Sequence, residues 1–556
     1  MTTNGGKRPN FRERLAGSLF RRMLKLPEGP AEYTIERDVR IPARDGVDLL
    51  AQHWAPVGDA VGTVVVHSPY GWNALWGAVY GAPYASQGYH VLLVSARGTF
   101  GSGGIFEPML NESSDTHDVA KWLREQTWFG GRFAMVGASY LGFAQWAMLL
   151  DPPPELVAAV IQVGPHDFAR AWSDDGAIKL NDMLAWSEFV ARQEEFGVVR
   201  ALVRLATISK RIEPALSTVP LSEGAAQLLG SGAPWFKRWI ENQSVDAAYW
   251  ESARLSAALD RVNVPVLLHT GWHDIFLDQT MEQYRHLSAR GVKVGLTVGP
   301  WTHNDIEEKA APQLVGEALD WLAPHFGVTV TEGRRENVKV FVSGAEAWEG
   351  FTVWPPETEE VAWYPQSSGL LNQHPDEGAM ASFVFDPEDP TPSIGGRLMT
   401  AQGGRQDDSA LARRNDVLTF TSAPLDNAVD LMGCPVVTLA HNFDTPTCDV
   451  FVRVSDVDPK GHSRNVTESL VRLDGASHDQ IRIVLDPTSH HFVPGNRIRL
   501  VVGGGSFPRW SRNPGTGGDA LTSTSMKPTH HTLDLGGSKL ALPTRNATEI
   551  PTYIGE

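Results

Sequence analysis

The chain has 556 residues, which is too long for one hydrophobic core and enough for two or three domains. Hydrophobic residues make up 42% and charged residues 20%, a composition that excludes a disordered chain. The formal net charge of −17 argues against a nucleic-acid partner, because phosphate contacts need clustered Lys and Arg. Two cysteines, Cys434 and Cys448, indicate neither a disulfide framework nor a zinc site. A single disulfide bridge between them stays an alternative.

The first thirty residues form a basic tail without the apolar core and cleavage site of a secretory signal. The spacing of apolar residues from Phe11 to Leu26 predicts an amphipathic helix that packs on the protein's own surface rather than a membrane anchor. No stretch is long and apolar enough for an integral membrane segment. We therefore expect a cytoplasmic protein.

Strands and helices alternate from Tyr33 to Val298. Two strands, 33–39 and 48–54, come first and are joined by turn residues. Segments that are apolar on both faces follow, as expected of buried parallel strands, at 63–66, 91–94, 133–136, 156–161, 264–268 and 294–298. Helical stretches separate the early segments, at 74–87, 113–126 and 140–150. This alternation predicts a parallel sheet covered by helices, with catalytic groups just past the carboxyl ends of its strands.

A strand, a sharp turn and a helix meet at Ser139. Gly137 precedes the serine and Gly142 follows it, in the layout of a nucleophile elbow that exposes a hydroxyl above a sheet. The usual spacing would place the second glycine at Leu141, one residue earlier. On this motif alone, an ordinary strand-turn-helix with an incidental serine stays open.

A serine, an acid and a histidine follow three predicted strands in the order Ser139, Asp274, His303. That order is the one found in α/β-hydrolases. In such chemistry His303 would take the proton of the Ser139 hydroxyl, and Asp274 would orient the imidazole. Two neighbours compete for these roles, His273 as the base and Asp278 as the acid.

The developing oxyanion of an acyl-transfer reaction needs hydrogen-bond donors. We expect one from the backbone N–H of Tyr140 and the other from the loop after the first parallel strand, where Tyr70 offers its hydroxyl.

No cofactor and no metal are expected. Adjacent histidines such as His490 and His491 point to opposite faces of a strand, and the glycine-rich run 98–104 lacks the Lys-Ser or Lys-Thr of a phosphate loop.

The alternation breaks between Pro165 and Arg261, where a helix-rich insert carries several aromatic residues. An insert at this place would overhang the nucleophile as a cap.

After Phe326, short β-like segments separated by turn residues continue to the end of the chain, beginning with Val338 to Val342. They predict a β-sandwich or jelly roll.

From about Tyr33 onward the chain resembles the CocE/NonD hydrolases, which are related to X-Pro dipeptidyl-peptidases and α-amino acid ester hydrolases. The segments that carry the resemblance are Arg44-Asp45-Gly46-Val47, Ser68-Pro69-Tyr70, Arg97-Gly98, Gly137-Ala138-Ser139-Tyr140-Leu141-Gly142, Gly271-Trp272-His273-Asp274, Gly299-Pro300-Trp301-Thr302-His303, Pro494-Gly495-Asn496-Arg497 and Ser506-Phe507-Pro508-Arg509-Trp510. The serine motif of the family is G-x-S-Y-x-G, so the late second glycine agrees with the resemblance.

The resemblance implies an α/β-hydrolase domain (31–166 and 262–332) with an inserted helical cap (167–261), then an all-β jelly-roll domain (333–556). It implies Ser139, Asp274 and His303 as the catalytic triad, with Tyr70 and Tyr140 at the oxyanion hole. The residues it suggests for the substrate pocket are Trp172, Trp186 and Phe276, and Trp72 is a further pocket candidate.

The function expected is hydrolysis of a small-molecule carboxylic ester, or of an amide, through an acyl-enzyme. An X-Pro dipeptidyl-peptidase or an α-amino acid ester hydrolase is the alternative, for which Asp174, Asp175 and Glu188 could hold a free ammonium group. A non-catalytic protein whose jelly roll binds a glycan or another ligand is the remote alternative. The oligomeric state is left open, with a homodimer considered.

Overall fold

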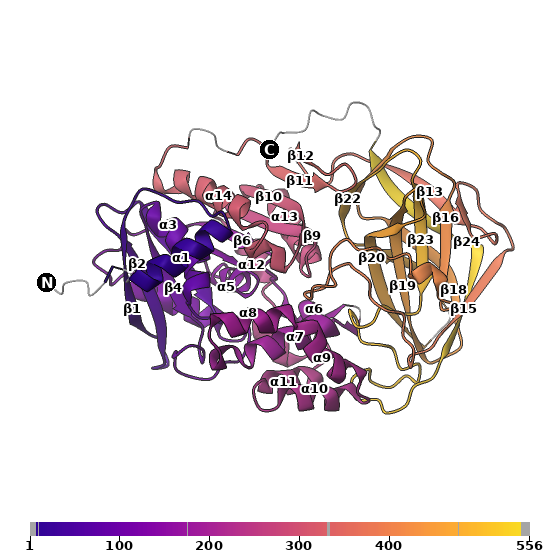
Figure 1. Ribbon diagram of the computed structural model, residues 1–556, viewed down its shortest axis with the longest axis horizontal. Coiled ribbons are helices and arrows are strands. Elements are labelled where there is room, and N and C mark those ends of the chain that lie inside the picture. Colours follow the sequence, from indigo (N-terminus) through magenta and orange to yellow (C-terminus); the bar gives the residue numbers. More distant parts are fainter. Residues whose placement is uncertain (1–6, 9–10, 175, 331–333, 476–477, 546–556) are drawn as a thin grey trace.

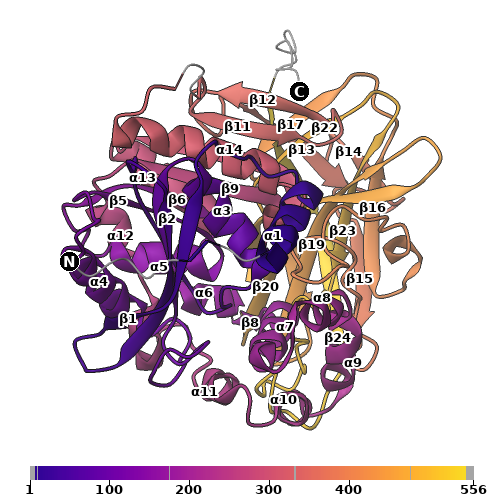
Figure 2. The ribbon, with the colours of Figure 1, turned by 60° about the vertical axis from the view of Figure 1, so that its left-hand side comes forward.

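The computed structural model describes residues 7–8, 11–174, 176–330, 334–475 and 478–545 (Figure 1). The amino-terminal half folds around a ten-stranded mixed sheet, and the carboxyl-terminal part is all β. Both views place the two parts side by side, with a group of short helices, α7 to α11, below them (Figures 1 and 2). The predicted fold class, an α/β-hydrolase domain followed by an all-β domain, is confirmed.

The first sheet is antiparallel at both edges and parallel in its centre. Its strands, in spatial order, are β1 (Tyr33–Pro42), β2 (Asp48–Pro56), β4 (Tyr89–Ser95), β3 (Gly62–Ser68), β5 (Phe133–Ala138), β6 (Leu156–Gln162), β9 (Val266–His273), β10 (Val294–Thr302), β11 (Val338–Val342) and β12 (Ala347–Phe351). All residues of β5 and β9 are buried, which explains why these sequences are apolar on both faces.

Helices from the strand connections cover this sheet. They are α2 (Ala74–Trp76), α3 (Ala82–Ser86), α4 (Glu112–Leu123), α5 (Tyr140–Met148), α13 (Leu277–Ala289) and α14 (Ala311–Leu322). Each of the predicted helical stretches in the early part of the chain therefore contains a helix, although 74–87 is divided by a π-helical turn at Gly77–Gly81. The interior of this half forms one continuous hydrophobic cluster with the buried side chains of the inserted segment.

The segment between β6 and β9 is mostly helical, as expected of a cap. Its elements are α6 (Phe168–Trp172), β7 (Ser173–Asp174), β8 (Ala177–Ile178), α7 (Leu180–Val190), α8 (Val198–Ala206), α9 (Ile208–Ser217), α10 (Leu221–Leu229), α11 (Pro234–Glu241) and α12 (Ala257–Arg261). Large aromatic side chains fill its interior, with Trp172, Trp239 and Trp250 fully buried. This segment reaches the loops at the carboxyl ends of the strands, where the Gln193 side chain donates to the Pro69 carbonyl at 2.8 Å.

The carboxyl-terminal part is a β-sandwich with its own hydrophobic core. Its strands are β13 (Glu359–Pro365), β14 (Leu370–Asn372), β15 (Met380–Phe385), β16 (Val417–Ser422), β17 (Val429–Gly433), β18 (Val436–Phe443), β19 (Thr447–Val457), β20 (Ser463–Asp474), β21 (His478–Val484), β22 (Thr488–Phe492), β23 (Arg497–Gly503) and β24 (Thr529–Arg545). One sheet runs β20-β19-β23-β16-β14-β13, and β24 links it to β15, β17 and β18 of the other sheet.

The boundary between the two parts differs from the expectation. Sequence reasoning assigned Val338–Val342 to the all-β domain, but this strand, β11, pairs in parallel with β10 and extends the first sheet. It alternates between buried and half-buried residues because it lies near the sheet edge, so its pattern resembles that of a sandwich strand. A bridge from Ser343 to His490 then connects this end of the first sheet to β22.

The predicted amino-terminal helix is α1 (Phe11–Met23). It contacts α2, and Leu26 just beyond it is buried, so the segment packs on the protein's own surface as expected. The side chains of Leu19 and Met23 remain 64% and 62% exposed. Among the residues that the structure describes, none of the helices has both the length and the hydropathy to cross a bilayer.

Candidate active site

Three side chains from three different strand ends form a chain of hydrogen bonds. Ser139 follows β5, Asp274 follows β9 and His303 follows β10. The Nε2 atom of His303 lies 2.9 Å from the Ser139 Oγ, and its Nδ1 atom lies 2.6 Å from the Asp274 Oδ1. The carboxyl ends of parallel strands meet at one edge of a sheet, which is why residues 164 positions apart come into contact. This is the geometry of a nucleophile, its base and the group that orients the base.

The backbone of Ser139 is held in a strained conformation. Its φ of 60° and ψ of −120° are unfavourable for a residue with a side chain. Close packing explains the flanking glycines: a Cβ on Gly137 would lie 2.4 Å from the Leu141 Cβ, and one on Gly142 would lie 2.6 Å from the Gly164 Cα. The second glycine therefore stands one residue later than in the common motif because that position faces Gly164.

Burial increases from the nucleophile to the acid. Ser139 is half-buried, His303 is 9% exposed and Asp274 is fully buried. The second carboxylate oxygen of Asp274 accepts hydrogen bonds from the Thr270 hydroxyl at 3.0 Å and the Phe276 backbone N–H at 3.2 Å. These bonds fix the carboxylate so that it points at the imidazole, while the serine hydroxyl stays within reach of a substrate.

Two donors adjoin the Ser139 hydroxyl. Tyr140 is the first residue of α5, so its backbone N–H has no partner within the helix. The Tyr70 hydroxyl accepts a hydrogen bond from the Trp186 indole N–H at 2.9 Å, which leaves its own proton free to be donated. Burial raises the pKa of Tyr70, and hydrogen bonds to Trp186 and Ser139 oppose this only in part. The phenol therefore stays protonated across the neutral range and can act as a donor.

Two carboxyl groups near the site, the buried Glu112 and the half-buried Glu307, were not found from the sequence. The Tyr140 hydroxyl donates to Glu112 of α4, and burial raises the pKa of this carboxyl to about 7. The Tyr80 hydroxyl donates to Glu307 and accepts from the Ala138 backbone N–H at 3.3 Å. Burial also raises the pKa of Glu307 to about 7, although the hydrogen bond from Tyr80 and the charge of His303 lower it in part, and the Glu307 charge helps to raise the pKa of Tyr70. A glutamate within a helical pattern carries no sequence signal of such a role.

The predicted pocket residues fall into two groups. Trp186 stacks on Tyr140 with ring centres 6.4 Å apart, and Phe276 meets the His303 ring edge-on at 5.3 Å, so both adjoin the triad. Trp172 instead packs in the interior of the cap. Its ring lies 5.6 Å from that of Trp239, which in turn stacks on Trp186, so Trp172 supports the pocket from behind.

Trp72 lies elsewhere. It lines a cavity of about 530 Å³ beside the amino-terminal helix, together with Tyr33 and Trp54. The chain turns at Gly71, whose φ is +70°, and Tyr70 and Trp72 consequently face different surroundings. The predicted substrate contact of Trp72 is not favoured by this position.

The rival catalytic residues are engaged in other contacts. Burial lowers the pKa of His273 to about 4, and its electrostatic neighbours are residues of the all-β domain. Burial alone would raise the pKa of Asp278, but the guanidinium of Arg397, 2.6 Å away, holds it well below the usual range. His490 and His491 bond to different carboxylates, Asp456 and Asp430, as expected for opposite faces of a strand.

The glycine-rich run 98–104 is a braced turn, as expected. The Arg97 guanidinium binds the carboxylates of Asp115 at 2.6 Å and Asp45 at 2.7 Å. A Cβ on Gly98 would lie 2.1 Å from the backbone nitrogen of Phe106, so this turn requires a residue without a side chain.

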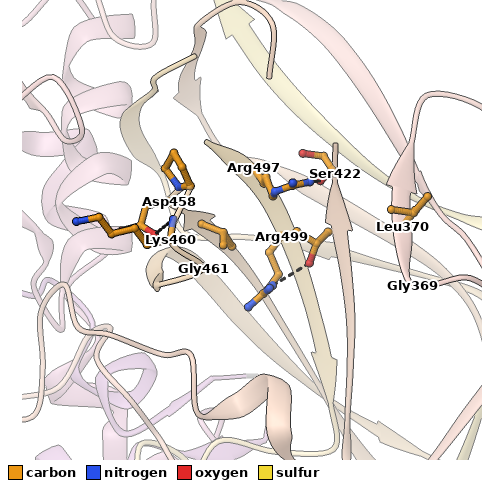
Figure 3. A pocket seen from close by; sticks show the side chains of 11 residues that line it. Gly369, Leu370, Ser422, Asp458, Lys460, Gly461, Arg497 and Arg499 are labelled. Atoms are coloured by element: carbon orange, nitrogen blue, oxygen red, sulfur yellow. Dashed lines mark hydrogen bonds between the residues drawn. The ribbon is translucent and has the colours of Figure 1, made fainter. Parts of the chain in front are cut away.

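A surface cavity of about 400 Å³ lies in the all-β domain, away from the triad (Figure 3). Lys460, Arg497 and Arg499 contribute to its lining, and the two arginines already donate to Ser422 and Thr421. Within the described part of the chain, its lining includes no aromatic side chain that could stack on a sugar ring. This cavity therefore gives no support to the alternative of a glycan-binding protein.

Comparisons with known proteins agree with this fold and site. The model of the X-Pro dipeptidyl-peptidase (S15 family) matches residues 45–305, and that of the X-Pro dipeptidyl-peptidase C-terminal non-catalytic domain matches residues 332–540. Cocaine esterase from Rhodococcus sp. (strain MB1 Bresler) is 27% identical over 543 residues, which cover 87% of this chain and 93% of the relative.

Two solved structures share the fold over nearly the whole chain. An aminopeptidase from the marine sediment archaeon Thaumarchaeota archaeon superposes with a TM-score of 0.79 at 21% identity, covering 92% of this chain and 96% of that one. An α-amino acid ester hydrolase superposes with a TM-score of 0.78 at 20% identity, covering 93% and 98%.

The fold is that of an α/β-hydrolase followed by an all-β domain. The chain carries both domains described for the X-Pro dipeptidyl-peptidases of the S15 family and is similar to cocaine esterase over most of its length, in agreement with the resemblance.

Proposed function

We propose that this protein hydrolyses carboxylic esters of small molecules through an acyl-enzyme on Ser139. The observation that carries the proposal is the continuous hydrogen-bond chain from Asp274 through His303 to Ser139, with bonds of 2.6 Å and 2.9 Å. A serine hydroxyl is a weak nucleophile, and such a chain supplies the base that activates it. Sequence similarity to an esterase over most of the chain supports the ester as substrate.

In the first half of the reaction, His303 takes the proton of Ser139 as the Oγ atom attacks the carbonyl carbon. Asp274 stabilises the imidazolium that forms. The Tyr140 backbone N–H and the Tyr70 hydroxyl donate to the developing oxyanion, and His303 then gives its proton to the leaving alcohol. Water repeats the sequence on the acyl-enzyme, which releases the acid and restores the serine.

The acyl group would lie against aromatic side chains. Trp186 and Phe276 adjoin the triad on two sides, and Phe189 lies near Tyr70, with ring centres 6.3 Å apart. These surfaces favour an apolar or aromatic acyl group. No metal or cofactor enters the proposed reaction.

Peptidase or amino acid ester hydrolase activity is a second candidate, favoured by the match to the S15 model. These activities need a carboxylate to hold a free ammonium group. Of the three acids considered, Glu188 is bound by Arg204 and Arg211, which neutralise it. Asp174 lies in β7, and Asp175 lies outside the described residues. Rates on matched N-blocked and free-amine esters would separate the candidates, because a peptidase needs the free amine.

The test of the proposal is labelling with a fluorescent fluorophosphonate followed by mass mapping. We expect one adduct on Ser139, loss of labelling and of ester hydrolysis in Ser139→Ala, and an unchanged melting temperature for that variant. Normal turnover by folded Ser139→Ala would sink the proposal.

A cytoplasmic location is also proposed, since Cys434 and Cys448 are both free thiols, as a reducing compartment favours. The absence of a nucleic-acid partner and the homodimer stay predictions.

A further inference from the structure

Two histidines and a cysteine meet inside the all-β domain, apart from the triad. They are His441 of β18, Cys448 of β19 and His531 of β24, and one potential ligand atom from each lies within 4.8 Å of the other two. Each residue is only 1% exposed. The Nε2 atom of His441 lies 3.0 Å from the Nδ1 atom of His531.

The architecture of the sandwich brings these residues together. Strands β18 and β24 are antiparallel neighbours, with His441 opposite Leu533 and Phe443 opposite His531, so the two imidazoles project from the same sheet. Cys448 belongs to β19 of the other sheet, where it pairs with Leu473. The cluster therefore spans the core between the two sheets.

The surroundings of the two imidazoles are apolar and aromatic. Phe383 stacks on His531 with ring centres 4.4 Å apart, and Phe443 stacks on His441 at 5.8 Å. The ring of His531 also lies 5.2 Å from that of His441. Its Nε2 atom is buried and has no hydrogen-bond partner among the described residues, an expensive arrangement for a polar group in a core.

We propose that His441, Cys448 and His531 form a binding site for a soft transition-metal ion, and that copper(I) is the ion it takes. Thiolate and imidazole are the ligands that such ions prefer. Two nitrogens bound to one ion lie about 3.3 Å apart. This is close to the 3.0 Å between the His441 Nε2 atom and the His531 Nδ1 atom. The ion would connect the two sheets of the sandwich.

Charge and ligand number select copper(I) over zinc. Binding breaks the S–H bond of Cys448, releases the proton to solvent and forms a metal–sulfur bond, without any change of oxidation state. A monovalent ion and one thiolate cancel in charge, which suits an apolar core, whereas Zn²⁺ would leave one positive charge there. Zn²⁺ also favours four ligands, and the cluster supplies three.

A route to the site exists on the outside of the sandwich. A surface cavity of about 800 Å³ is lined by Phe383 and His531, among other residues. Rotation of the Phe383 ring would open the cluster to this cavity. On the same lining, Arg414 pairs with Asp389 and Asp416, so the entrance carries little net negative charge.

The test titrates the reduced, full-length protein with copper(I) under anaerobic conditions, in competition with a chromophoric copper(I) chelator. We expect one copper ion per chain. At a free copper concentration about a hundredfold above the dissociation constant, the melting temperature of the 556-residue chain should rise by roughly 2–3 °C. A parallel titration with Zn²⁺ should show binding at least about tenfold weaker.

The chain supplies a matched control, because its other cysteine, Cys434, is exposed. Cys434→Ser should bind copper as the wild type does, whereas Cys448→Ser should bind at least about a hundredfold more weakly. If Cys448→Ser fails to fold, His531→Phe tests the same cluster with an aromatic ring retained in the core. Copper binding that survives in folded Cys448→Ser or His531→Phe, absence of binding by the wild type, or preference for Zn²⁺ would each overturn the proposal.

Ester hydrolysis plays no part in this experiment, and Ser139→Ala should bind copper like the wild type. The outcome is therefore independent of the proposed hydrolase activity.

Discussion

At the scale of single residues, the arrangement around Ser139 assigns different tasks to two tyrosines. Tyr140 contributes its backbone N–H, while its side chain is held away from the substrate by Glu112. Tyr70 contributes its side chain, which Trp186 orients by donating to the phenol oxygen at 2.9 Å. The oxyanion hole that we propose thus has one backbone donor and one side-chain donor, and Tyr70→Phe removes the latter without changing the backbone.

Tyr70→Phe removes that donor and leaves the ring in place. We expect the rate of acylation to fall by about ten- to a thousandfold, because one of two oxyanion contacts is lost. Single-turnover measurement of acylation with a chromogenic ester checks this. Trp76 stacks on Tyr70, so Trp76→Phe serves as a control for ring packing. An unchanged acylation rate would refute the donor role of Tyr70.

Glu112 links the stability of this region to pH. Its pKa is raised by burial to about 7 from 4.5, so the folded state holds its proton more tightly than the unfolded state. The resulting stabilisation is present below about pH 4.5 and is lost as pH rises through 7. The side chain of Glu112→Gln cannot ionise. As pH rises from 5 to 8, the free energy of unfolding of the variant should therefore increase by about 2 kcal/mol relative to that of the wild type.

The measurement compares the free energies of unfolding of wild type and Glu112→Gln at the two pH values. Glutamine keeps an acceptor for the Tyr140 hydroxyl but loses one for the Asn111 N–H, which costs the same at both pH values. A difference between the two proteins that does not change with pH would contradict the raised pKa.

At the scale of elements, the strand-turn-helix unit from β5 to α5 depends on close contact with the end of β6. Gly142 in α5 and Gly164 after β6 approach so closely that neither can carry a side chain. The glycine therefore serves the packing of helix against strand, and through it the position of Ser139.

Gly142→Ala should destabilise the protein by about 1–3 kcal/mol, because the added Cβ would lie 2.6 Å from the Gly164 Cα and the backbone must shift. Gly316→Ala in α14 is the matched control. A Cβ there meets nothing within 4 Å, so this helix should gain about 0.5–1 kcal/mol. Equal effects of the two substitutions in thermal unfolding would show that the contact is unimportant.

At the scale of the whole molecule, buried charges connect the two parts. Arg397 of the all-β domain is 4% exposed and binds Asp278 of α13 at 2.6 Å, Asp486 at 2.5 Å and the Ile275 carbonyl at 2.8 Å. Ile275 directly follows the catalytic acid Asp274. The all-β domain therefore holds the loop that carries the acid.

Arg397→Met leaves the half-buried Asp278 without its bound guanidinium and leaves Asp486 with only Arg509, 3.4 Å away, and should cost about 3–5 kcal/mol of stability. Arg124→Met, which breaks a largely exposed pair with Glu155, should cost at most about 1 kcal/mol. Denaturant unfolding of both variants gives the comparison. A loss for Arg397→Met no larger than for Arg124→Met would exclude a structural role for the buried network.

The sequence predicted the features that follow from local pattern. Ser139, Asp274 and His303 were selected because each directly follows an apolar strand, and the structure places their side chains within hydrogen-bond distance of one another. Glu112 and Glu307 were missed because their partners lie 28 and 227 residues away and nothing in the local pattern marks them. The direction of Trp72 could not be predicted, because the chain turns at Gly71 just before it. The strand β11 was assigned to the wrong sheet because an edge strand and a sandwich strand share one pattern of exposure.

The pairing of β10 with β11 has a consequence for how the chain can be divided. A shortened protein ending after α14 would keep Ser139, Asp274 and His303, yet it would leave the backbone of β10 unpaired on one side from Leu296 to Val298. Open edges of this kind invite pairing with another chain and aggregation. The strand that covers this edge comes from the segment that leads into the all-β domain, so a shortened chain should end after β12 rather than after α14.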